Sequence, residues 1–233
     1  SAVGAAQYLY YVYHKNSKNI SDNKGLIQEN VYVGPSFSDK DIKSFLDSKN
    51  IPFELFDDSA ILKKTAQLIA DGNVVGWYQG KMEWGPRALG NRSILADPRR
   101  ADMKDILNAK IKHRESFRPF APSIMEEFAS EYFEINVPSP YMLMVAPVKK
   151  PKEIPAVTHV DGTGRLQTVS KENNELYYNL INEFYKITGV PVIINTSMNV
   201  MGEPIVNTPE QAHQMIVKTD MDYIVMGNYL VKK

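Results

Sequence analysis

Residues 80–93, GKMEWGPRALGNRS, most constrain the fold, because they suit neither a core helix nor a core strand. Three glycines let the backbone approach a ligand closely. Arg87 and Arg92 supply flat, permanently charged forks that match phosphate or carboxylate oxygens. Apolar stretches at 74–78 and 93–96 flank the segment. We therefore predict a loop between two buried strands that grips an anion.

Positive charge is concentrated around this loop. The whole chain of 233 residues is neutral, with 27 basic and 27 acidic residues. Residues 79–118 nevertheless hold ten Lys and Arg against five Asp and Glu, and they include a second basic cluster, KIKHRESFR. Such a window suits a polyanionic ligand. The alternative is a solvated basic face with ordinary surface salt bridges.

Length and composition set broad bounds. The chain is long enough for one or two domains with a sizeable core. It has no cysteine, which excludes disulfides, zinc thiolates and a cysteine nucleophile. It has no apolar run of membrane-spanning length and no secretory signal. We expect a cytoplasmic protein, and the opening at Ser1 rather than Met indicates a piece of something longer.

Strand and helix patterns alternate without a strict βαβ rhythm, which favours a mixed sheet with helices packed on it. Ser38, Asp58 or Ser59, and Thr208 are the expected helix N-caps. The expected helices cover residues 1–14, 39–48, about 58–70, 100–111, 173–188 and 208–218. The expected strands cover 31–33, 52–56, 74–78, 93–96, 120–124, 141–148, 166–169, 190–195, 222–226 and 229–231.

A second polar site follows an apolar strand in the stretch IINTSMNVMGEP, residues 193–204. Ligands in α/β sheets tend to bind just beyond strand ends. Ser197 and Asn199 are two residues apart, so both can present donors and acceptors to one phosphate or carbonyl group. The alternative is a plain turn made of turn-favouring residues.

A third site is the stretch HVDGTGRLQ, residues 159–167, where Arg165 leaves a Gly-rich turn at the head of a strand. Arg165 is placed either to reach a ligand or to lie on the surface beside a hairpin. His159 and Asp161 have metal-ligating side chains, but two groups without a third make a poor metal site. We therefore expect no metal in this chain.

Four motifs together resemble the C-terminal region of the NodU/CmcH-type O-carbamoyltransferases, which include nodulation-factor and antibiotic-tailoring enzymes. The motifs cover nearly the whole chain in the family's order. They are GKMEWGPRALGNRSILADPR, KIKHRESFRPFAPSI, HVDGTGRLQTV and NTSMNVMGEPIVNTPEQA.

The resemblance implies an α/β (α+β) fold for residues 31–233, with a YrdC-like twisted mixed sheet and flanking helices around a basic cavity. This domain would bind ATP and carbamoyl phosphate and form carbamoyl-adenylate. Residues 1–30 are expected to be the C-terminal remnant of a preceding Kae1-like transferase domain plus a linker. That domain would pass the carbamoyl group to a hydroxyl. Mg²⁺ would arrive with ATP, and iron or another metal would belong only to the preceding domain.

The resemblance also implies roles for individual residues. The family's Lys-x-Arg and Ser-x-Asn signatures match Lys112-His113-Arg114 and Ser197-Met198-Asn199. Lys112 and Arg114 would neutralise phosphates, while Arg87 and Arg165 would hold carbamoyl phosphate and the developing leaving group. Ser197 and Asn199 would contact the α-phosphate or the carbamoyl group. We expect these six residues to line one cavity.

Further residues are expected to bind substrate or ATP: Lys81, Gly85, Arg92, Ser93, Arg118 and Asn195. Alternatively, Arg92 or Arg118 braces the cavity through salt bridges with Glu83 or Glu115.

Other functions fit the sequence less well. A threonylcarbamoyl-adenylate synthase would carry a different loop in place of GKMEWGPRALG. A nucleic-acid-binding module usually has a net positive domain with interleaved aromatic residues, which this neutral chain lacks. A non-catalytic interaction domain would not need the intact signature residues. The sequence therefore predicts small-molecule substrates, and neither nucleic acid nor membrane as a partner.

Overall fold

The computed structural model describes residues 2–14, 30–115 and 117–233, and it comprises two compact units, Ser1–Val31 and Tyr32–Lys233. In the first unit, α1 (Ala2–Gln7) continues into the π-helical η1 (Tyr8–Tyr13), so the helix expected over residues 1–14 is present. The linker expected over 15–30 lies, except for Asn30, outside the described residues. The assignment of this unit to a preceding domain stays a prediction.

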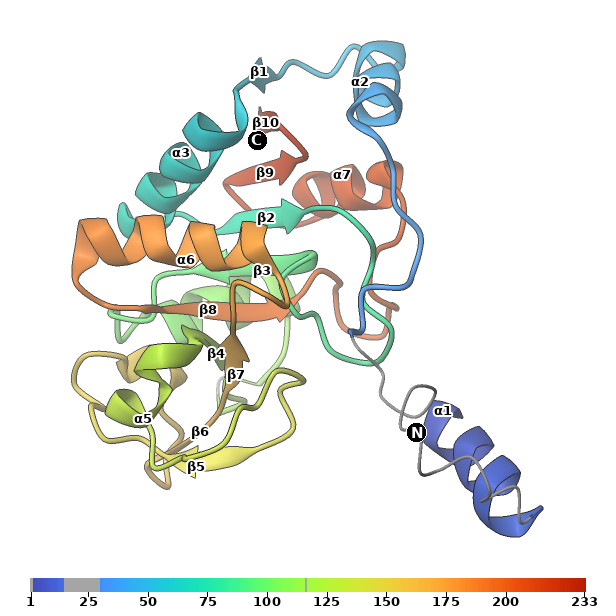
Figure 1. Ribbon diagram of the computed structural model, residues 1–233. Coiled ribbons are helices and arrows are strands. Elements are labelled where there is room, and N and C mark those ends of the chain that lie inside the picture. The colour runs from blue at the N-terminus through green and yellow to red at the C-terminus, as the bar shows by residue number, and fades with distance from the viewer. Residues whose placement is uncertain (1, 15–29, 116) are drawn as a thin grey trace. The chain divides into compact units, whose positions relative to one another are not determined.

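The second unit is built on an eight-stranded mixed sheet with the order β1-β10-β9-β2-β3-β8-β4-β7 (Figure 1). Neighbouring strands are antiparallel except for two parallel pairs, β2 with β9 and β4 with β7. The strands are β1 (Glu54–Leu55), β2 (Val75–Tyr78), β3 (Arg92–Ala96), β4 (Ala121–Met125), β7 (Gln167–Val169), β8 (Val192–Ser197), β9 (Tyr223–Met226) and β10 (Tyr229–Lys232). A separate two-stranded sheet pairs β5 (Val145–Pro147) with β6 (Thr163–Arg165).

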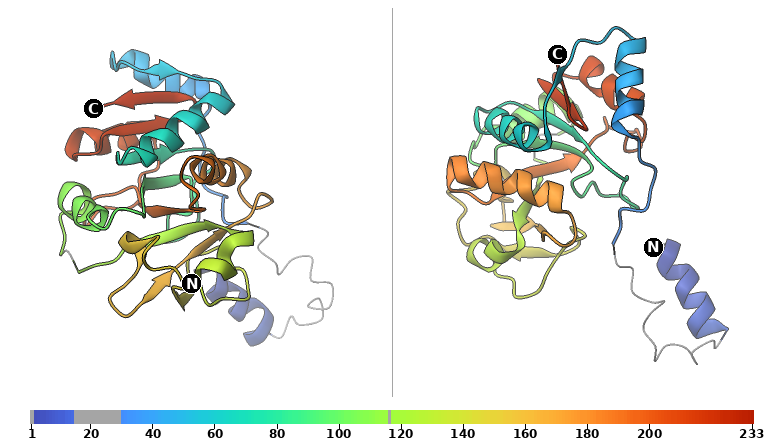
Figure 2. Two further views of the ribbon diagram at one scale, coloured as in Figure 1. Left: turned by 90° about the vertical axis from the view of Figure 1, so that its left-hand side faces the viewer. Right: turned by 45° about the horizontal axis from the view of Figure 1, so that its top comes forward.

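Helices cover both faces of the large sheet, and Figure 2 shows this layering from two further directions. On one face, α3 (Asp58–Ala70) and α6 (Glu175–Thr188) pack against each other. The other helical segments are α2 (Asp39–Ser48), α4 (Met103–Leu107), η3 (Asn108–Lys112), η4 (Glu126–Phe128), α5 (Ala129–Tyr132), η5 (Pro155–Val157) and α7 (Pro209–Lys218). The arrangement confirms the mixed α/β sheet with flanking helices.

The core lies in two layers because successive strand residues point to opposite faces of the sheet. Ile193 belongs to the apolar cluster under α3 and α6, while its neighbour Ile194 belongs to the cluster on the other face. Leu95 and Ile94 of β3 divide in the same way. Both faces of the central strands are therefore dry, and polar groups gather at the strand ends.

The helix starts follow the capping chemistry of the sequence. The Ser38 hydroxyl accepts from the backbone N–H of Asp41, and that of Thr208 accepts from the backbone N–H of Gln211, each in a capping box. The third cap is Asp57 rather than Asp58 or Ser59, because the Asp57 carboxylate accepts from two N–H groups of the first turn.

Three sequence-based elements need correction. Residues 31–33 form no strand; just beyond them, backbone bonds at 2.9 Å join Gly34 N to the carbonyl of Met82, and Met82 N to that of Pro35. The strand expected over 141–148 is reduced to β5, because Met142 has a φ of 54° that breaks an extended ladder. The helix expected over 100–111 widens into the π-helical η3 at its end.

Candidate functional site

A basic pocket with a volume of about 320 Å³ lies at the end of β8, beside the loop that joins β2 to β3. Its polar lining comprises Arg87, Lys112, Arg114, Arg118, Arg165, Asn195, Thr196, Ser197 and Asn199. In the part of the chain that the structure describes, no Asp or Glu lines it. The pocket therefore gathers the six residues expected to share one cavity, although their catalytic and binding roles stay predictions.

Lys112 joins the two signature motifs directly. It ends η3 and is only 5% exposed. Its Nζ donates to the Ser197 carbonyl at 2.6 Å and to the carbonyl and Oδ1 of Asn199, each at 2.9 Å. Burial, followed by the positive charges of Arg114 and Arg118, lowers the pKa of Lys112 to about 7. This ammonium thus holds the Ser-x-Asn turn in place as well as facing the pocket.

Arg114 reaches the pocket because the chain reverses at His113, which adopts the left-handed conformation with a φ of 46°. Its Nε donates to Oδ1 of Asn108 at 2.7 Å, and its guanidinium carbon lies 4.7 Å from the centre of the Phe120 ring. Burial and the neighbouring arginines lower the pKa of Arg114. The side chain is therefore held in one orientation by uncharged partners, which leaves its charge available to an anion.

Arg165 ends β6, and its buried Nε has no hydrogen-bond partner among the described residues. Its Nη2 lies 4.0 Å from the sulfur of Met142. Burial, followed by the charge of Arg87, lowers the pKa of Arg165. Arg87 and Arg165 repel each other across the pocket, and no acidic residue in the described ranges pairs with either, so an anion would stabilise the site.

Asn195 links the pocket to the core of the sheet. It is 1% exposed, and its Nδ2 donates to the Ala88 carbonyl at 3.2 Å, to Oγ of Ser123 at 3.1 Å and to Oε1 of Gln167 at 2.9 Å. Gln167 in turn donates through Nε2 to the Leu89 carbonyl at 2.9 Å. This buried network on β4, β7 and β8 holds the backbone of the loop that joins β2 to β3, residues 79–91, which we call the Gly-rich loop.

Four residues expected to bind substrate do not line the pocket: Lys81, Gly85, Arg92 and Ser93. Lys81 and Gly85 lie exposed on the outer part of the loop. Ser93 is fully buried, and its Oγ accepts from the backbone N–H of Gly90 at 3.0 Å.

Arg92 lies outside the pocket lining and makes many contacts of its own. It is fully buried, its guanidinium carbon lies 3.8 Å from the centre of the Tyr78 ring, and its Nη atoms donate to the carbonyls of Gln79, Asn91, Pro35 and Gly80. Burial lowers the pKa of Arg92. It braces the loop through these carbonyls, and among the described residues neither Arg92 nor Arg118 forms the alternative salt bridge with Glu83 or Glu115.

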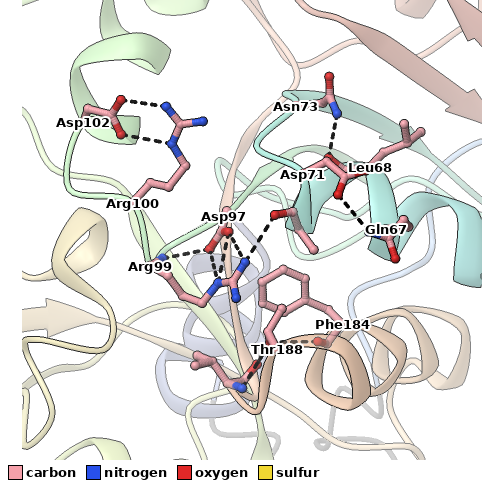
Figure 3. A network of polar contacts seen from close by, with 12 residues as sticks. Gln67, Leu68, Asp71, Asn73, Asp97, Arg99, Arg100, Asp102, Phe184 and Thr188 are labelled. Atoms are coloured by element: carbon pink, nitrogen blue, oxygen red, sulfur yellow. Dashed lines mark hydrogen bonds and ion pairs between the residues drawn. The ribbon is translucent and has the colours of Figure 1, made fainter.

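Part of the basic window does not line the pocket, and Figure 3 shows two of its arginines bound to acidic side chains instead. Arg99 grips the buried carboxylate of Asp97 with Nε and Nη2, at 2.9 and 2.6 Å. Arg100 pairs with Asp102 on the surface at 2.7 Å. Local charge alone therefore overstated the number of cations available to a ligand.

Several polar residues that shape the site carried only a weak signal in the sequence. Ser123 and Gln167 are polar positions inside apolar strands, which is the pattern of a buried network. The sequence suggests Glu83 only as a salt-bridge partner, yet the residue is 4% exposed and lies inside the Gly-rich loop.

No metal-ligating cluster is formed in the described part of the chain, where no three His, Cys, Asp or Glu side chains come together. Asp161 accepts instead from the backbone N–H and the hydroxyl of Thr163, at 3.0 and 2.7 Å. The ring Nδ1 of His159 lies 3.1 Å from the same hydroxyl. These two residues shape a turn. None of the described helices is both long and apolar enough to cross a membrane.

Residues 66–233 match the family model described as "Carbamoyltransferase C-terminus". The chain belongs to this family. It is 50% identical over 213 residues to nodulation protein NolNO of Sinorhizobium fredii, covering 88% of this chain and 31% of that protein. It is 41% identical over 256 residues to protein sll1178 of Synechocystis sp., covering 100% of this chain and 41% of that protein. The chain thus spans less than half the length of these curated relatives.

Solved structures share the fold at low sequence identity. A HypF structure "in the phosphate- and nucleotide-bound form" aligns with a TM-score of 0.52 and 18% identity, covering 73% of this chain and 25% of that chain. A second structure, "P. abyssi Sua5 complexed with L-threonine", aligns with a TM-score of 0.53 and 18% identity, covering 75% of this chain and 48% of that chain. These neighbours confirm the expected YrdC-like architecture.

Proposed function

We propose that this domain binds ATP and carbamoyl phosphate in the basic pocket and forms carbamoyl-adenylate. The observation that carries the proposal is the pocket itself, where five cationic side chains face the Ser-x-Asn turn and no described acidic residue lines the wall. Both substrates are polyanions, and bringing them together requires several fixed positive charges. Membership of the carbamoyltransferase family supports the carbamoyl group as the part transferred.

The proposed chemistry uses the pocket for positioning and charge compensation. Water cleaves carbamoyl phosphate into carbamate and phosphate, and a carbamate oxygen then attacks the α-phosphorus of ATP. The bond between the α-phosphorus and its bridging oxygen breaks, so pyrophosphate leaves and carbamoyl-adenylate remains. Arg114 and Arg165 would stabilise the phosphate charges, and the Ser197 hydroxyl would contact the α-phosphate or the carbamoyl group. Mg²⁺ would travel with ATP, and no step is assigned to it.

The molecule that receives the carbamoyl group takes part in a later step. In that step the carbamoyl group is transferred to a hydroxyl. In longer members of the family, we assign this transfer to the Kae1-like portion that precedes this domain. The relatives of this chain are long enough to include such a portion.

A pyrophosphate-release assay with the 233-residue chain tests the proposal. The chain is incubated with ATP and carbamoyl phosphate, and mass spectrometry identifies the nucleotide product. Carbamoyl-adenylate with stoichiometric pyrophosphate supports the proposal. A second arm replaces carbamoyl phosphate with L-threonine and bicarbonate, because one structural neighbour was solved with L-threonine. Adenylate formed only in that arm would contradict the proposal, as would ADP in place of pyrophosphate.

A further inference from the structure

The carboxylate of Glu83 lies inside the Gly-rich loop and binds its backbone. Its Oε1 accepts from the N–H groups of Leu89 and Asn91, each at 2.7 Å, and from that of Arg92 at 3.2 Å. Three converging amides form the kind of concavity that binds anions. Here the chain's own glutamate fills it, so these amides are not available to a phosphate.

The carbonyls of the same stretch are held from the opposite side. The Leu89 carbonyl accepts from the Tyr32 hydroxyl at 2.8 Å and from Nε2 of Gln167 at 2.9 Å. The Ala88 carbonyl accepts from Nδ2 of Asn195 at 3.2 Å. Side chains from distant parts of the sequence therefore satisfy both the donors and the acceptors of this irregular backbone, as a buried loop requires.

The part of the loop between these fixed points contributes residues to the pocket lining. Glu83 and Leu89 bracket residues 84–88, of which Pro86, Arg87 and Ala88 line the pocket. Arg87 is exposed and makes no ion pair in the described structure, so its own side chain does not fix its position. The path of its backbone decides where its guanidinium can reach.

We propose that Glu83 is a positioning residue, which closes the loop on itself and so presents Arg87 to an anion in the pocket. It contacts no substrate. That Arg87 binds an anionic substrate rests on the proposed function, whereas the clamp, meaning the contact between Glu83 and the loop amides, does not.

Replacing Glu83 by the neutral glutamine removes a negative charge and weakens the clamp on the loop amides, and these two changes predict opposite effects on anion binding. A carboxylate near a cationic pocket repels anions, so its removal alone should tighten anion binding. Loss of the clamp should weaken binding, because Arg87 would sample several positions and ordering it would oppose association. Glu115 offers a matched control, since it is an exposed acid in the basic cluster and forms no ion pair with the Gly-rich loop in the described structure.

The experiment compares wild type, Glu83→Gln and Glu115→Gln, with inorganic pyrophosphate as the probe. Calorimetry measures affinity, and NMR hydrogen exchange measures protection of the Leu89 and Asn91 amides. We expect Glu83→Gln to weaken pyrophosphate binding about tenfold and to speed exchange at both amides about tenfold, with amides of β8 unchanged, since bonds to a charged acceptor are replaced by weaker bonds to the neutral glutamine oxygen. Glu115→Gln should leave exchange unchanged and binding equal or tighter.

Two results would overturn the clamp: pyrophosphate binding by Glu83→Gln as tight as in wild type or tighter, or unchanged exchange at Leu89 and Asn91. If Glu83→Gln does not fold, hydrogen exchange of the wild-type amides tests the clamp instead. The Leu89 amide should exchange at least about tenfold more slowly than that of Arg87, for which the described residues provide no acceptor; equal rates would reject the clamp. Neither readout needs carbamoyl phosphate or turnover, so failure of adenylate formation leaves this test intact.

Discussion

The ammonium group of Lys112 is chelated by Asn199, whose carbonyl oxygen and Oδ1 each lie 2.9 Å from Nζ. The contact joins two signature motifs that are 87 residues apart in the sequence. Lys112 is thus part of the architecture of the pocket before any ligand arrives. A lysine in this position carries its charge at a cost, since it is buried beside two arginines.

The first prediction concerns the pH dependence of stability. The pKa of Lys112 falls from 10.5 to about 7 in the folded protein, so between these values the unfolded chain binds more protons than the folded one. The free energy of unfolding should therefore rise with pH through this window, relative to Lys112→Met, by on the order of 3 kcal/mol. Urea denaturation of both proteins at pH 7 and pH 10 measures this difference.

An exposed lysine on the same helical segment supplies the control for this experiment. Lys110→Met should show the same pH profile as wild type, because Lys110 lies on the surface. Parallel profiles for wild type and Lys112→Met would show that the Lys112 ammonium is not penalised in the folded state.

The second prediction concerns ATP binding by Arg114. Its guanidinium is held by Asn108 and Phe120, so replacing it removes a cation that is already oriented toward the pocket. Arg114→Ala should weaken ATP binding by about tenfold to hundredfold, the range for a hydrogen bond to a charged group. Calorimetric titration measures it, with Arg100→Ala as the control, since Arg100 pairs with Asp102 at the surface. Equal losses in both variants would indicate general electrostatics instead of a specific contact.

The polar ends of the strands could be predicted because their signal is local. The apolar run before Asn195 requires a strand, and the polar residues after it require an exposed end; β8 indeed ends at Ser197. The convergence of Arg87, Lys112 and Arg165 on one pocket could not be derived from spacing. It followed from the family resemblance, because the sheet order that brings these residues together is a property of the whole fold.

Arg92 shows why the sequence does not tell which of the expected site residues line the pocket. Nothing in the sequence distinguishes an arginine that faces a ligand from one whose guanidinium is occupied by backbone carbonyls. The difference depends on Pro35, which is far from Arg92 in sequence, yet whose carbonyl accepts a hydrogen bond from Nη2 of Arg92. Met142 is similar, because a positive φ is uncommon for a methionine and the residue type gives no sign of it in the sequence.

The third prediction compares two part-buried arginines. Arg165 has no acidic partner in the described structure, so Arg165→Ala should leave the melting temperature equal or higher while weakening pyrophosphate binding about tenfold or more. Arg99→Ala should leave the buried carboxylate of Asp97 unpaired and lower the free energy of unfolding by roughly 3 kcal/mol. Calorimetric melting and binding titrations distinguish the two. A drop of many degrees for Arg165→Ala would make Arg165 a structural residue.

The fourth prediction concerns Gly90, at the end of the Gly-rich loop. Its φ of 109° is one that residues with side chains rarely adopt, and a Cβ placed there would lie 2.2 Å from the ring of Tyr177. That ring belongs to α6 and is fully buried, so it cannot move aside without disturbing the core. Gly90→Ala should therefore destabilise the fold by about 2–4 kcal/mol, through overpacking and backbone strain together.

Gly202 separates these two contributions. It also has a positive φ, 84°, but a Cβ there would meet nothing within 4 Å. Gly202→Ala should thus report the backbone term alone, about 1 kcal/mol, and thermal denaturation of both variants measures the difference. We expect a melting temperature for Gly90→Ala that is lower by several degrees than that for Gly202→Ala. Similar melting temperatures would mean that the loop can withdraw from Tyr177, and that its contact with α6 does not hold the pocket wall in place.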